Sequence, residues 1–371
     1  MKIIHSADIH LDSPFTVSDP SQAEKRRHAL RSAFSNLVLY AKTNSVDLFI
    51  ISGDLFDREC VTKDTTLMLC REMASVPTCR FVIAPGNHDP YNKNSAYSLV
   101  SFPENVYIFK SPEISHFEFD DLGCRVYGYA FTSDTYENRP LQNFKLPKDG
   151  YNGINILAAH CDFDCEKSYY APVTREDLQN SGFDYAAFGH IHKGSAELEK
   201  AGDTYFAYSG CLEGRSFDET GPKGALVGEI EKGRVSLKKV RFSLKRYEKI
   251  SVDVSGSHTF ADCAQMLSAA CSEFDSDTIL RVTLTGITSP EFFCDEVSVK
   301  QVLSFLSGVE VRDETLAILD MNNLKTENTL AGEFYRSLED KLFSEDQEEK
   351  RIAYGALKYG LRAINGMDIN L

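Results

Sequence analysis

Five short apolar runs in this chain end alike, because each is followed at once by aspartate or histidine, or by a glycine turn that carries such residues. Continuous apolar runs are typical of strands buried on both faces of an α/β sheet. Sites in such folds form beyond the carboxyl ends of strands, so we expect one site built from five strand ends. The runs and their endings are 2–7 with Asp8, 46–52 with Gly53-Asp54, 80–84 with Pro85-Gly86-Asn87-His88, 154–159 with His160, and 185–188 with Gly189-His190-Ile191-His192.

The spacing of these polar residues favours a shared metal site. Asp8 and His10 are two residues apart, as are His190 and His192, which puts each pair on one side of an extended segment. Either pair alone is a weak signal. Five of the nine histidines follow these strands, however, and reading each as an unrelated loop or core histidine would require five coincidences. These five are His10, His88, His160, His190 and His192.

The mixture of carboxylate, imidazole and amide groups indicates which cations such a site would bind. Ligands of these kinds suit Mn, Fe or Zn, whereas all-oxygen cages suit Mg or Ca. Asp54, on a tight turn after Gly53, is placed to bridge two cations about 3.5–4 Å apart. A cation pair of this kind lowers the pKa of a bridging water and orients a phosphate for in-line displacement. The sequence therefore predicts a two-metal phosphoesterase, with manganese as the expected cation.

Four neighbouring residues are candidates for roles on the substrate. His88 follows Asn87 directly, so we expect it over the open face of the metals, where it would protonate a leaving oxygen or hold a phosphate oxygen. Asp89 is the expected catalytic partner of His88, with a turn-forming role as the alternative. Asp57 is expected to orient a histidine ligand. Arg58 is expected to bind a substrate phosphate, with a surface ion pair as the alternative.

Taken together, the motifs resemble the signature of calcineurin-like metallophosphoesterases, complete and in order. This resemblance implies a four-layer αββα sandwich, an α/β fold, and a catalytic role for His88. It also implies a first metal held by Asp8, His10, Asp54 and His192, and a second held by Asp54, Asn87, His160 and His190. The motifs are Asp8-Ile9-His10, Gly53-Asp54-x-x-Asp57, Gly86-Asn87-His88-Asp89, Ala159-His160 and Gly189-His190-Ile191-His192.

Within that superfamily, the segments 3–12 and 208–224 resemble the SbcD-type DNA repair exonucleases, and most of all a bacterial, YhaO-like branch. The resemblance covers about residues 1–245. It implies exonucleolytic or endonucleolytic cleavage of DNA by a metal-activated hydroxide, and an SMC-like coiled-coil ATPase as a partner. A phosphatase, a cyclic-nucleotide phosphodiesterase and a subunit that mainly positions DNA for the ATPase remain alternatives, and two copies of the chain could pair.

The chain is expected to have three parts. A polar, basic stretch at 243–249 interrupts the strand pattern, so we place the phosphoesterase domain at 1–245. A small α+β capping domain is expected at 246–328 and a helical segment at 329–371. Apolar residues at helical spacing in that last segment favour packing on its own domain or docking on a partner ATPase, and the pattern alone leaves both open.

Composition limits the partners and the compartment. The formal net charge of −15 argues against a surface that is basic all over and coated with nucleic acid, but it leaves room for local patches such as 25–31 and 238–249. The ten cysteines include no CxxC pair, which is typical of free thiols in a reducing compartment. No apolar stretch approaches the roughly 20 residues of a membrane span, so a cytoplasmic protein is expected.

Overall fold

The computed structural model describes residues 1–15, 20–57, 61–288, 292, 294–317 and 321–366. Its chain divides into two compact units, Met1–Arg246 and Tyr247–Leu371, which are described separately below. Within the described ranges, no helix has the length and apolar character that crossing a membrane requires. The nine cysteines in these ranges are free thiols.

The first unit contains two six-stranded sheets. In the first sheet, β1 to β4 run parallel to one another, while β11 pairs antiparallel with β1 and β12 pairs antiparallel with β11. Its order is β12 (Arg234–Arg241), β11 (Gly224–Glu231), β1 (Lys2–Ser6), β2 (Leu48–Ile51), β3 (Arg80–Ile83) and β4 (Val106–Ile108).

The second sheet has a parallel centre with one antiparallel strand at each edge. Its order is β5 (Ser115–Phe119), β6 (Cys124–Gly128), β7 (Ile154–His160), β8 (Tyr185–Gly189), β10 (Thr204–Tyr208) and β9 (Glu199–Ala201). Every residue of β2, β7 and β8 is buried, in agreement with their continuous apolar sequences.

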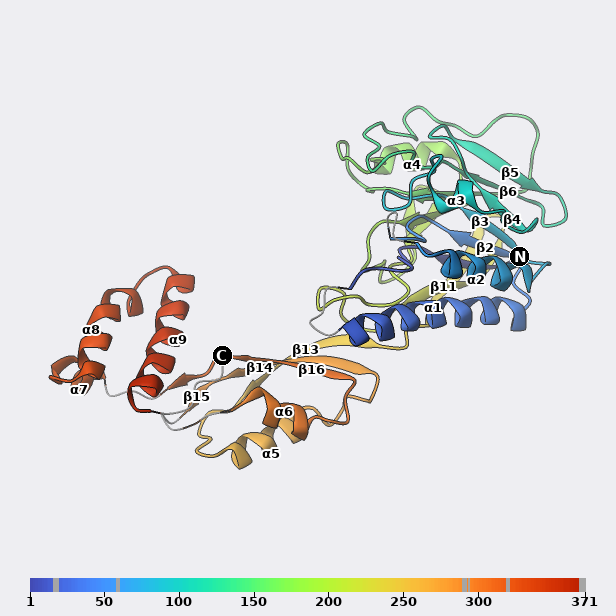
Figure 1. Ribbon diagram of the computed structural model, residues 1–371. Coiled ribbons are helices and arrows are strands. Elements are labelled where there is room, and N and C mark those ends of the chain that lie inside the picture. The colour runs from blue at the N-terminus through green and yellow to red at the C-terminus, as the bar shows by residue number, and fades with distance from the viewer. Residues whose placement is uncertain (16–19, 58–60, 289–291, 293, 318–320, 367–371) are drawn as a thin grey trace. The chain divides into compact units, whose positions relative to one another are not determined.

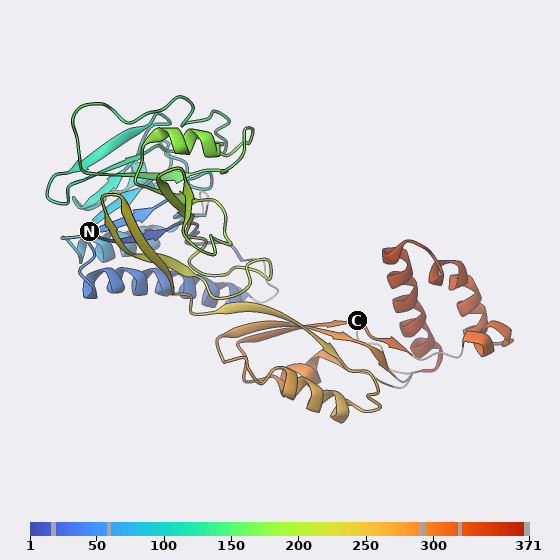
Figure 2. The same ribbon diagram turned by 180° about the vertical axis from the view of Figure 1, so that it is seen from behind.

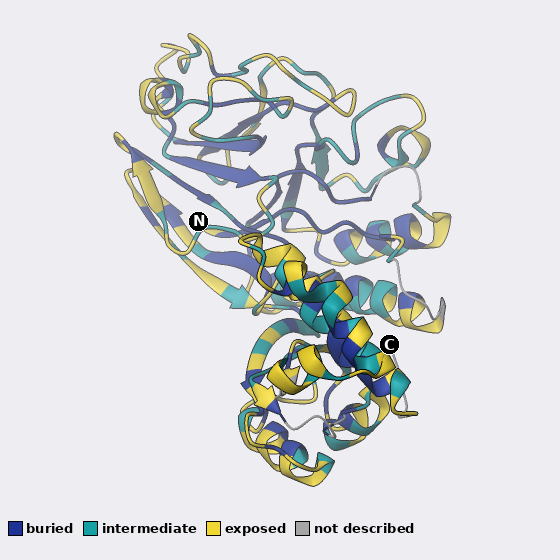
Figure 3. Cartoon of the chain, turned by 90° about the vertical axis from the view of Figure 1, so that its left-hand side faces the viewer, coloured by how far each residue is buried: buried dark blue, intermediate teal, exposed yellow. Residues whose placement is uncertain are grey.

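Three apolar clusters join these sheets and their helices into four layers. Helices α1 (Pro20–Thr43) and α2 (Lys63–Ala74) cover the outer face of the first sheet, and α4 (Arg175–Ser181) covers the outer face of the second. The inner faces of the two sheets pack directly on each other. Figures 1 and 2 show α1 and α2 on one side of the sheets and α4 on the other, and Figure 3 shows the mostly buried strands between them. The expected αββα sandwich is thereby confirmed.

Local sequence explains where the short helix α4 begins. Thr174 is its N-cap, and its side chain accepts a hydrogen bond from the Asp177 amide while the Asp177 carboxylate accepts one from the Thr174 amide. This capping box satisfies two amides that otherwise have no partner at a helix start. Another short helix, α3 (Ala96–Leu99), follows β3 and precedes β4.

The second unit combines a three-stranded sheet with two groups of helices. Helices α5 and α6 pack with the sheet around one apolar cluster, while α8 and α9 share another. The division into a capping domain at 246–328 and a helical segment at 329–371 stays a prediction. Its elements are β13 (Arg246–Asp253), α5 (Phe260–Ala270), β14 (Thr278–Thr285), β15 (Ile287–Thr288), α6 (Glu296–Val302), β16 (Gly308–Asp313), β17 (Leu316–Ala317), α7 (Met321–Thr326), α8 (Leu330–Leu342) and α9 (Gln347–Ile364).

Two buried basic side chains join α9 to the remainder of this unit. The Lys358 ammonium donates to the Asp313 carboxylate at 2.7 Å and to the Thr315 hydroxyl at 2.5 Å. The Arg362 guanidinium donates to the carbonyl oxygen of Phe292 at 3.2 Å. These contacts tie the last helix to its own unit, while the choice between packing and docking for its apolar stripe stays a prediction.

Replacement of Lys358 by alanine should destabilise this unit by about 1–3 kcal/mol, because the Asp313 carboxylate would lose its charged partner. Denaturant unfolding of the full chain measures the change. Lys341→Ala, on the exposed end of α8, is the matched control and should lie within about 0.5 kcal/mol of wild type. Equal stability of the two variants would show that the Lys358 contacts do not hold α9 in place.

Candidate metal centre

The seven expected ligands gather where five strands of the first unit end. Asp8 follows β1, Asp54 follows β2, and Asn87 follows β3, while the second sheet contributes its own strand ends from β7 and β8. Donor atoms lie within 4.8 Å of one another in each of three overlapping groups. These groups are Asp8, His10 and His192; Asp8, Asp54 and His160; and His10, Asp57 and His88.

The backbone adopts an uncommon conformation at these turns. Four of the expected ligands have positive φ, namely Asp8 (51°), His10 (51°), Asp54 (52°) and His190 (109°). Residues other than glycine rarely adopt this region, and such conformations cluster at functional sites. Hydrogen bonds between the two turns maintain it, because the amides of Ile9 and His10 both donate to the carbonyl oxygen of Asp54, at 2.8 and 2.9 Å.

Two glycines let the turns approach each other closely. A Cβ atom on Gly53, whose φ is +90°, would lie 2.2 Å from Nδ1 of His160. A Cβ atom on Gly86 would lie 2.2 Å from Oδ1 of Asp54. Both contacts are shorter than any real side chain could tolerate, so glycine at these positions creates the space that the ligand side chains occupy.

The Asp54 carboxylate lies between the two expected halves of the centre. Its Oδ2 atom is 3.6 Å from Nε2 of His10 and 3.5 Å from Nε2 of His160. Its other oxygen accepts a hydrogen bond from the His88 amide at 2.9 Å. One carboxylate oxygen thus faces a histidine from each half, an arrangement that suits a bridging ligand.

In the first half, two imidazole nitrogens point at each other. Nε2 of His10 and Nε2 of His192 are 3.2 Å apart. Nδ1 of His192 lies 2.6 Å from the Glu219 carboxylate, so it carries the proton and donates to Glu219. The lone pair of the His192 Nε2 atom is therefore directed at His10, as it would be toward a shared cation.

The second half shows the same relationship. Nδ1 of His160 donates to the carbonyl oxygen of Ser52 at 3.0 Å, which leaves the lone pair of its Nε2 atom 2.9 Å from Oδ1 of Asn87. The His190 ring lies 5.1 Å from the His160 ring, and its Nε2 atom is 3.3 Å from the Asp162 carboxylate. Acceptor atoms that face each other in this way are favourable only when a proton or a cation lies between them.

The electrostatics of the site also suit divalent cations. Burial lowers the pKa of His10 and of His160 to about 4, so both imidazoles are neutral near pH 7, the form that binds a metal. Burial and the charge of Asp54 raise the pKa of Asp8 well above its usual value. Two buried carboxylates repel each other in this way unless positive charge offsets them. The donor set present therefore fits a pair of divalent transition-metal ions.

The structure corrects the expected partner of His88. Nδ1 of His88 lies 3.0 Å from the Asp57 carboxylate, not against Asp89. The Asp89 carboxylate instead accepts hydrogen bonds from the backbone amides of Asp54 and Gly86, at 3.1 and 2.7 Å, and from the Tyr97 hydroxyl at 2.6 Å. Asp89 is therefore a structural residue that ties two ligand turns together. The partner of the His88 ring is thus 31 residues away in the sequence, whereas Asp89 is only its neighbour along the chain.

Three residues outside the predicted set contact the site. Arg215 donates to the Asp57 carboxylate at 3.3 Å, Glu219 accepts from His192, and Asp162 lies against His190. Burial alone would raise the pKa of Glu219, but the hydrogen bond of His192 and the charge of Arg215 lower it to about 2. Position 58, where a phosphate-binding arginine was expected (Arg58), lies outside the described residues.

Comparison with known proteins agrees with this geometry. The family model described as calcineurin-like phosphoesterase matches residues 1–194, just over half of the chain. An uncharacterized metallophosphoesterase, YhaO of Bacillus subtilis, is 27% identical over 85% of this chain and 79% of its own length. The DNA double-strand break repair protein Mre11 of Aeropyrum pernix is 26% identical over 68% of this chain and 64% of its own length. The chain thus spans less than two thirds of that archaeal relative.

Solved structures are more distant in sequence. A protein of Thermus thermophilus named TT1561 is 11% identical, with a TM-score of 0.40 over 65% of this chain and 99% of its own. A dimetal phosphatase from Danio rerio is 14% identical, also with a TM-score of 0.40, over 66% of this chain and 99% of its own.

Gly86→Ala should lose most of its bound manganese, because the added methyl group would displace the Asp54 carboxylate. Metal content after desalting of manganese-loaded protein gives the readout. Gly355→Ala is the control, since a Cβ at that helical position has nothing within 4 Å, and it should keep wild-type content. Full manganese content in Gly86→Ala would mean that Asp54 does not hold the cations.

Proposed function

Because this chain belongs to the calcineurin-like phosphoesterase family, we propose that it hydrolyses phosphodiester bonds of DNA with two manganese ions bound at the candidate centre. The observation that carries the phosphoesterase chemistry is the position of the Asp54 carboxylate. His10 of one half and His160 of the other lie at about equal distances from one of its oxygens. DNA as the substrate is supported by the similarity to proteins named for DNA double-strand break repair.

The chain's own residues hold the cations and orient the ligand rings in this proposal. When bound, a pair of divalent cations acidifies the attacking water, orients the phosphate and offsets the charge that develops during displacement. His10, His160 and the other expected ligands hold that pair as neutral imidazoles, carboxylates and an amide. Glu219 and the carbonyl oxygen of Ser52 fix the ring tautomers of two of these histidines, so that Nε2 of each faces the centre.

His88 is the proposed catalytic residue that acts on the substrate. Its side chain keeps 30% of its surface exposed, whereas His10 and His160 are fully buried, so a substrate can reach it. Its Nδ1 atom donates to Asp57, which leaves Nε2 to hold a phosphate oxygen or to donate a proton to the leaving oxygen. Arg215 and the Ser13 hydroxyl contact the other Asp57 oxygen, so Asp57 and Arg215 are positioning residues.

The second unit supports a proposed protein partner. Leu330, Phe343 and Ile352 of the α8–α9 region are 70%, 61% and 60% exposed. Exposed apolar side chains of this kind are common on interaction surfaces. Docking of this region on an SMC-like coiled-coil ATPase is part of the proposal, as the family resemblance of the sequence implies.

His88→Ala should lower the rate of DNA cleavage by about 100-fold or more while both manganese ions stay bound. The measurement uses chelator-stripped, manganese-reloaded protein and end-labelled duplex DNA, with metal content determined in parallel. His116→Ala, an exposed histidine on the edge strand β5, is the control and should keep the wild-type rate within about twofold.

The same protein is assayed beside DNA on a phosphopeptide and on a cyclic nucleotide. If the protein cleaves either compound but leaves DNA intact, the phosphatase or the cyclic-nucleotide alternative replaces the nuclease. The net charge of −15 favours the phosphatase. A His88→Ala protein that loses its metals, or that cleaves DNA at full rate, would contradict the role given to His88.

A further inference from the structure

A buried glutamate joins the loop that carries Arg215 to the last segment of the first unit. Glu213 lies in the loop between β10 and β11, residues 209–223, and is only 3% exposed. One oxygen of its carboxylate accepts from the Leu244 amide at 2.7 Å, and the other accepts from the Lys245 amide at 2.8 Å. Both distances are at the short end of the range for N–H···O hydrogen bonds. Glu213 therefore holds two adjacent residues with its two oxygens.

Backbone contacts join the far end of the loop to the same segment. The amides of Phe242 and Ser243 both donate to the carbonyl oxygen of Lys223, at 3.1 and 3.2 Å. The Ser243 hydroxyl accepts from the Lys223 amide at 3.2 Å. These bonds fix the loop where it enters β11, whereas Glu213 fixes the part that precedes Arg215.

Three anchors hold the first part of this loop, which contains no helix and no strand and lies wholly within the described residues. The amide of Cys211 donates to the His192 carbonyl oxygen at 3.0 Å, and the Leu212 side chain is buried in the apolar core of the first unit. The Glu213 carboxylate is the third. Because the first two precede it, Glu213 is the last of these anchors before Arg215.

The side chain of Arg215 is itself held by long contacts. Its guanidinium donates to the Asp57 carboxylate and to the Ser13 hydroxyl at 3.3 Å each, and it lies 3.5 Å from the Glu219 carboxylate. Its Nε atom is buried and has no hydrogen-bond partner among the described residues. An unpaired buried donor costs free energy, so these contacts alone hold the guanidinium weakly. The position of the loop backbone therefore determines whether Arg215 reaches Asp57.

Arg215 in turn acts on the proposed catalytic histidine. Asp57 accepts from Arg215 with one oxygen, and its other oxygen lies 3.0 Å from Nδ1 of His88. A displaced guanidinium removes a positive charge from beside Asp57 and loosens the carboxylate that orients the His88 ring. Glu213 binds backbone amides and not this ring, so its effect on His88 passes through Arg215.

We propose that Glu213 is a positioning residue for phosphodiester hydrolysis, which fixes the loop so that Arg215 holds Asp57 and, through Asp57, the His88 ring. This inference rests on the proposed function. The segment that Glu213 binds lies directly before β13, and none of the expected metal ligands belongs to it. The rate of hydrolysis therefore depends on a part of the chain that lies outside the metal centre.

The experiment measures kcat and KM of manganese-loaded full chains on a small chromogenic diester, bis-p-nitrophenyl phosphate. Glu213→Ala should lower kcat about tenfold and change KM by less than about twofold, because the loss falls on the orientation of His88. Glu213→Gln keeps one acceptor oxygen and should recover part of that loss. Manganese content should equal that of wild type in both variants.

A double substitution separates positioning from general destabilisation. Residues that act through one another have effects that do not multiply, whereas independent effects do. Arg215→Ala should lower kcat at least as much as Glu213→Ala does. The combined Glu213→Ala/Arg215→Ala protein should match Arg215→Ala alone within about twofold, because Glu213 has nothing left to position.

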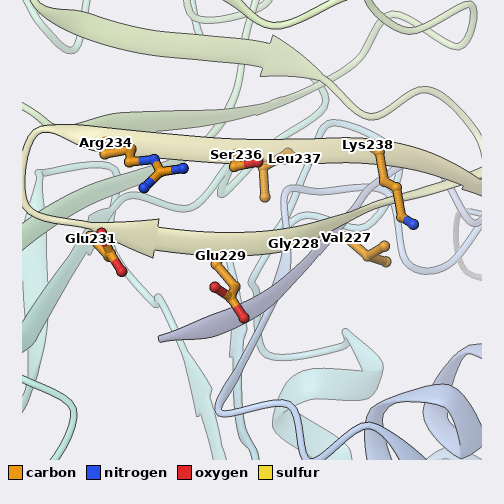
Figure 4. Close-up of a pocket in the computed structure, with 8 residues that line it drawn as sticks. All are labelled: Val227, Gly228, Glu229, Glu231, Arg234, Ser236, Leu237 and Lys238. Carbon is orange, nitrogen blue, oxygen red and sulfur yellow. The ribbon is translucent and has the colours of Figure 1, made fainter.

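Glu229 provides the matched control. This glutamate lies on β11 rather than in the loop, is exposed, and lines a groove of about 420 Å³ along the β11–β12 hairpin with Glu231 and Lys238 (Figure 4). Glu229→Ala removes the same carboxylate from a surface position. Its kcat should stay within about twofold of wild type.

The outcomes that would overturn the inference differ from those that would overturn the proposed function. If wild type cleaves neither the diester nor DNA, the proposed function fails and the inference falls with it. If wild type cleaves the diester but Glu213→Ala keeps full kcat, the inference alone is wrong. The same holds if the double variant is about tenfold slower than Arg215→Ala, since the two effects would then be independent. Thermal unfolding shows which variants are folded, and Glu213→Gln replaces Glu213→Ala in the comparison should the latter unfold.

Discussion

The buried Asp54 carboxylate is the group on which the architecture of the site depends. It lies where β2 ends between the two sheets, with Nε2 of His10 and of His160 at 3.6 and 3.5 Å from one oxygen. Surrounding features make that position possible. Gly86 leaves space for its side chain, and Asp89 binds its backbone amide. Burying a carboxylate without a positively charged partner costs free energy, so the folded site requires positive charge next to Asp54.

The parallel strands explain why ligands so far apart in sequence meet here. Strands β1, β2 and β3 of one sheet and β7 and β8 of the other end at the same edge of the sandwich, and each carries an expected ligand at or just after its carboxyl end. The apolar core between the sheets fixes the positions of these strand ends, while short turns with positive φ direct the ligand side chains toward one another. Stability and function are therefore coupled at the turns, where backbone strain is balanced by hydrogen bonds and by the expected cations.

Local pattern, namely apolar runs followed by metal-binding residue types, predicted that the seven expected ligands gather at one site. The sandwich was implied by the resemblance of the motifs to calcineurin-like metallophosphoesterases. The pairing of His88 was not accessible in the same way. Asp57 and Asp89 are both near a ligand in sequence, and only the folded turns show that Asp57 faces the ring while Asp89 faces backbone amides. Arg215 and Glu219 were missed as site residues for the same reason, because they reach the centre from beyond β10.

The most direct measurement of the central claim is the electron paramagnetic resonance spectrum of the full chain titrated with Mn²⁺. A carboxylate shared between two sites holds the ions close enough for spin coupling, since bridged pairs lie about 3.5–4 Å apart. We predict an exchange-coupled dinuclear spectrum at two ions per chain, and its loss in Asp54→Asn. A spectrum of isolated, uncoupled Mn²⁺ at full loading would contradict the account, because Asp54 would then not bridge the two halves of the centre.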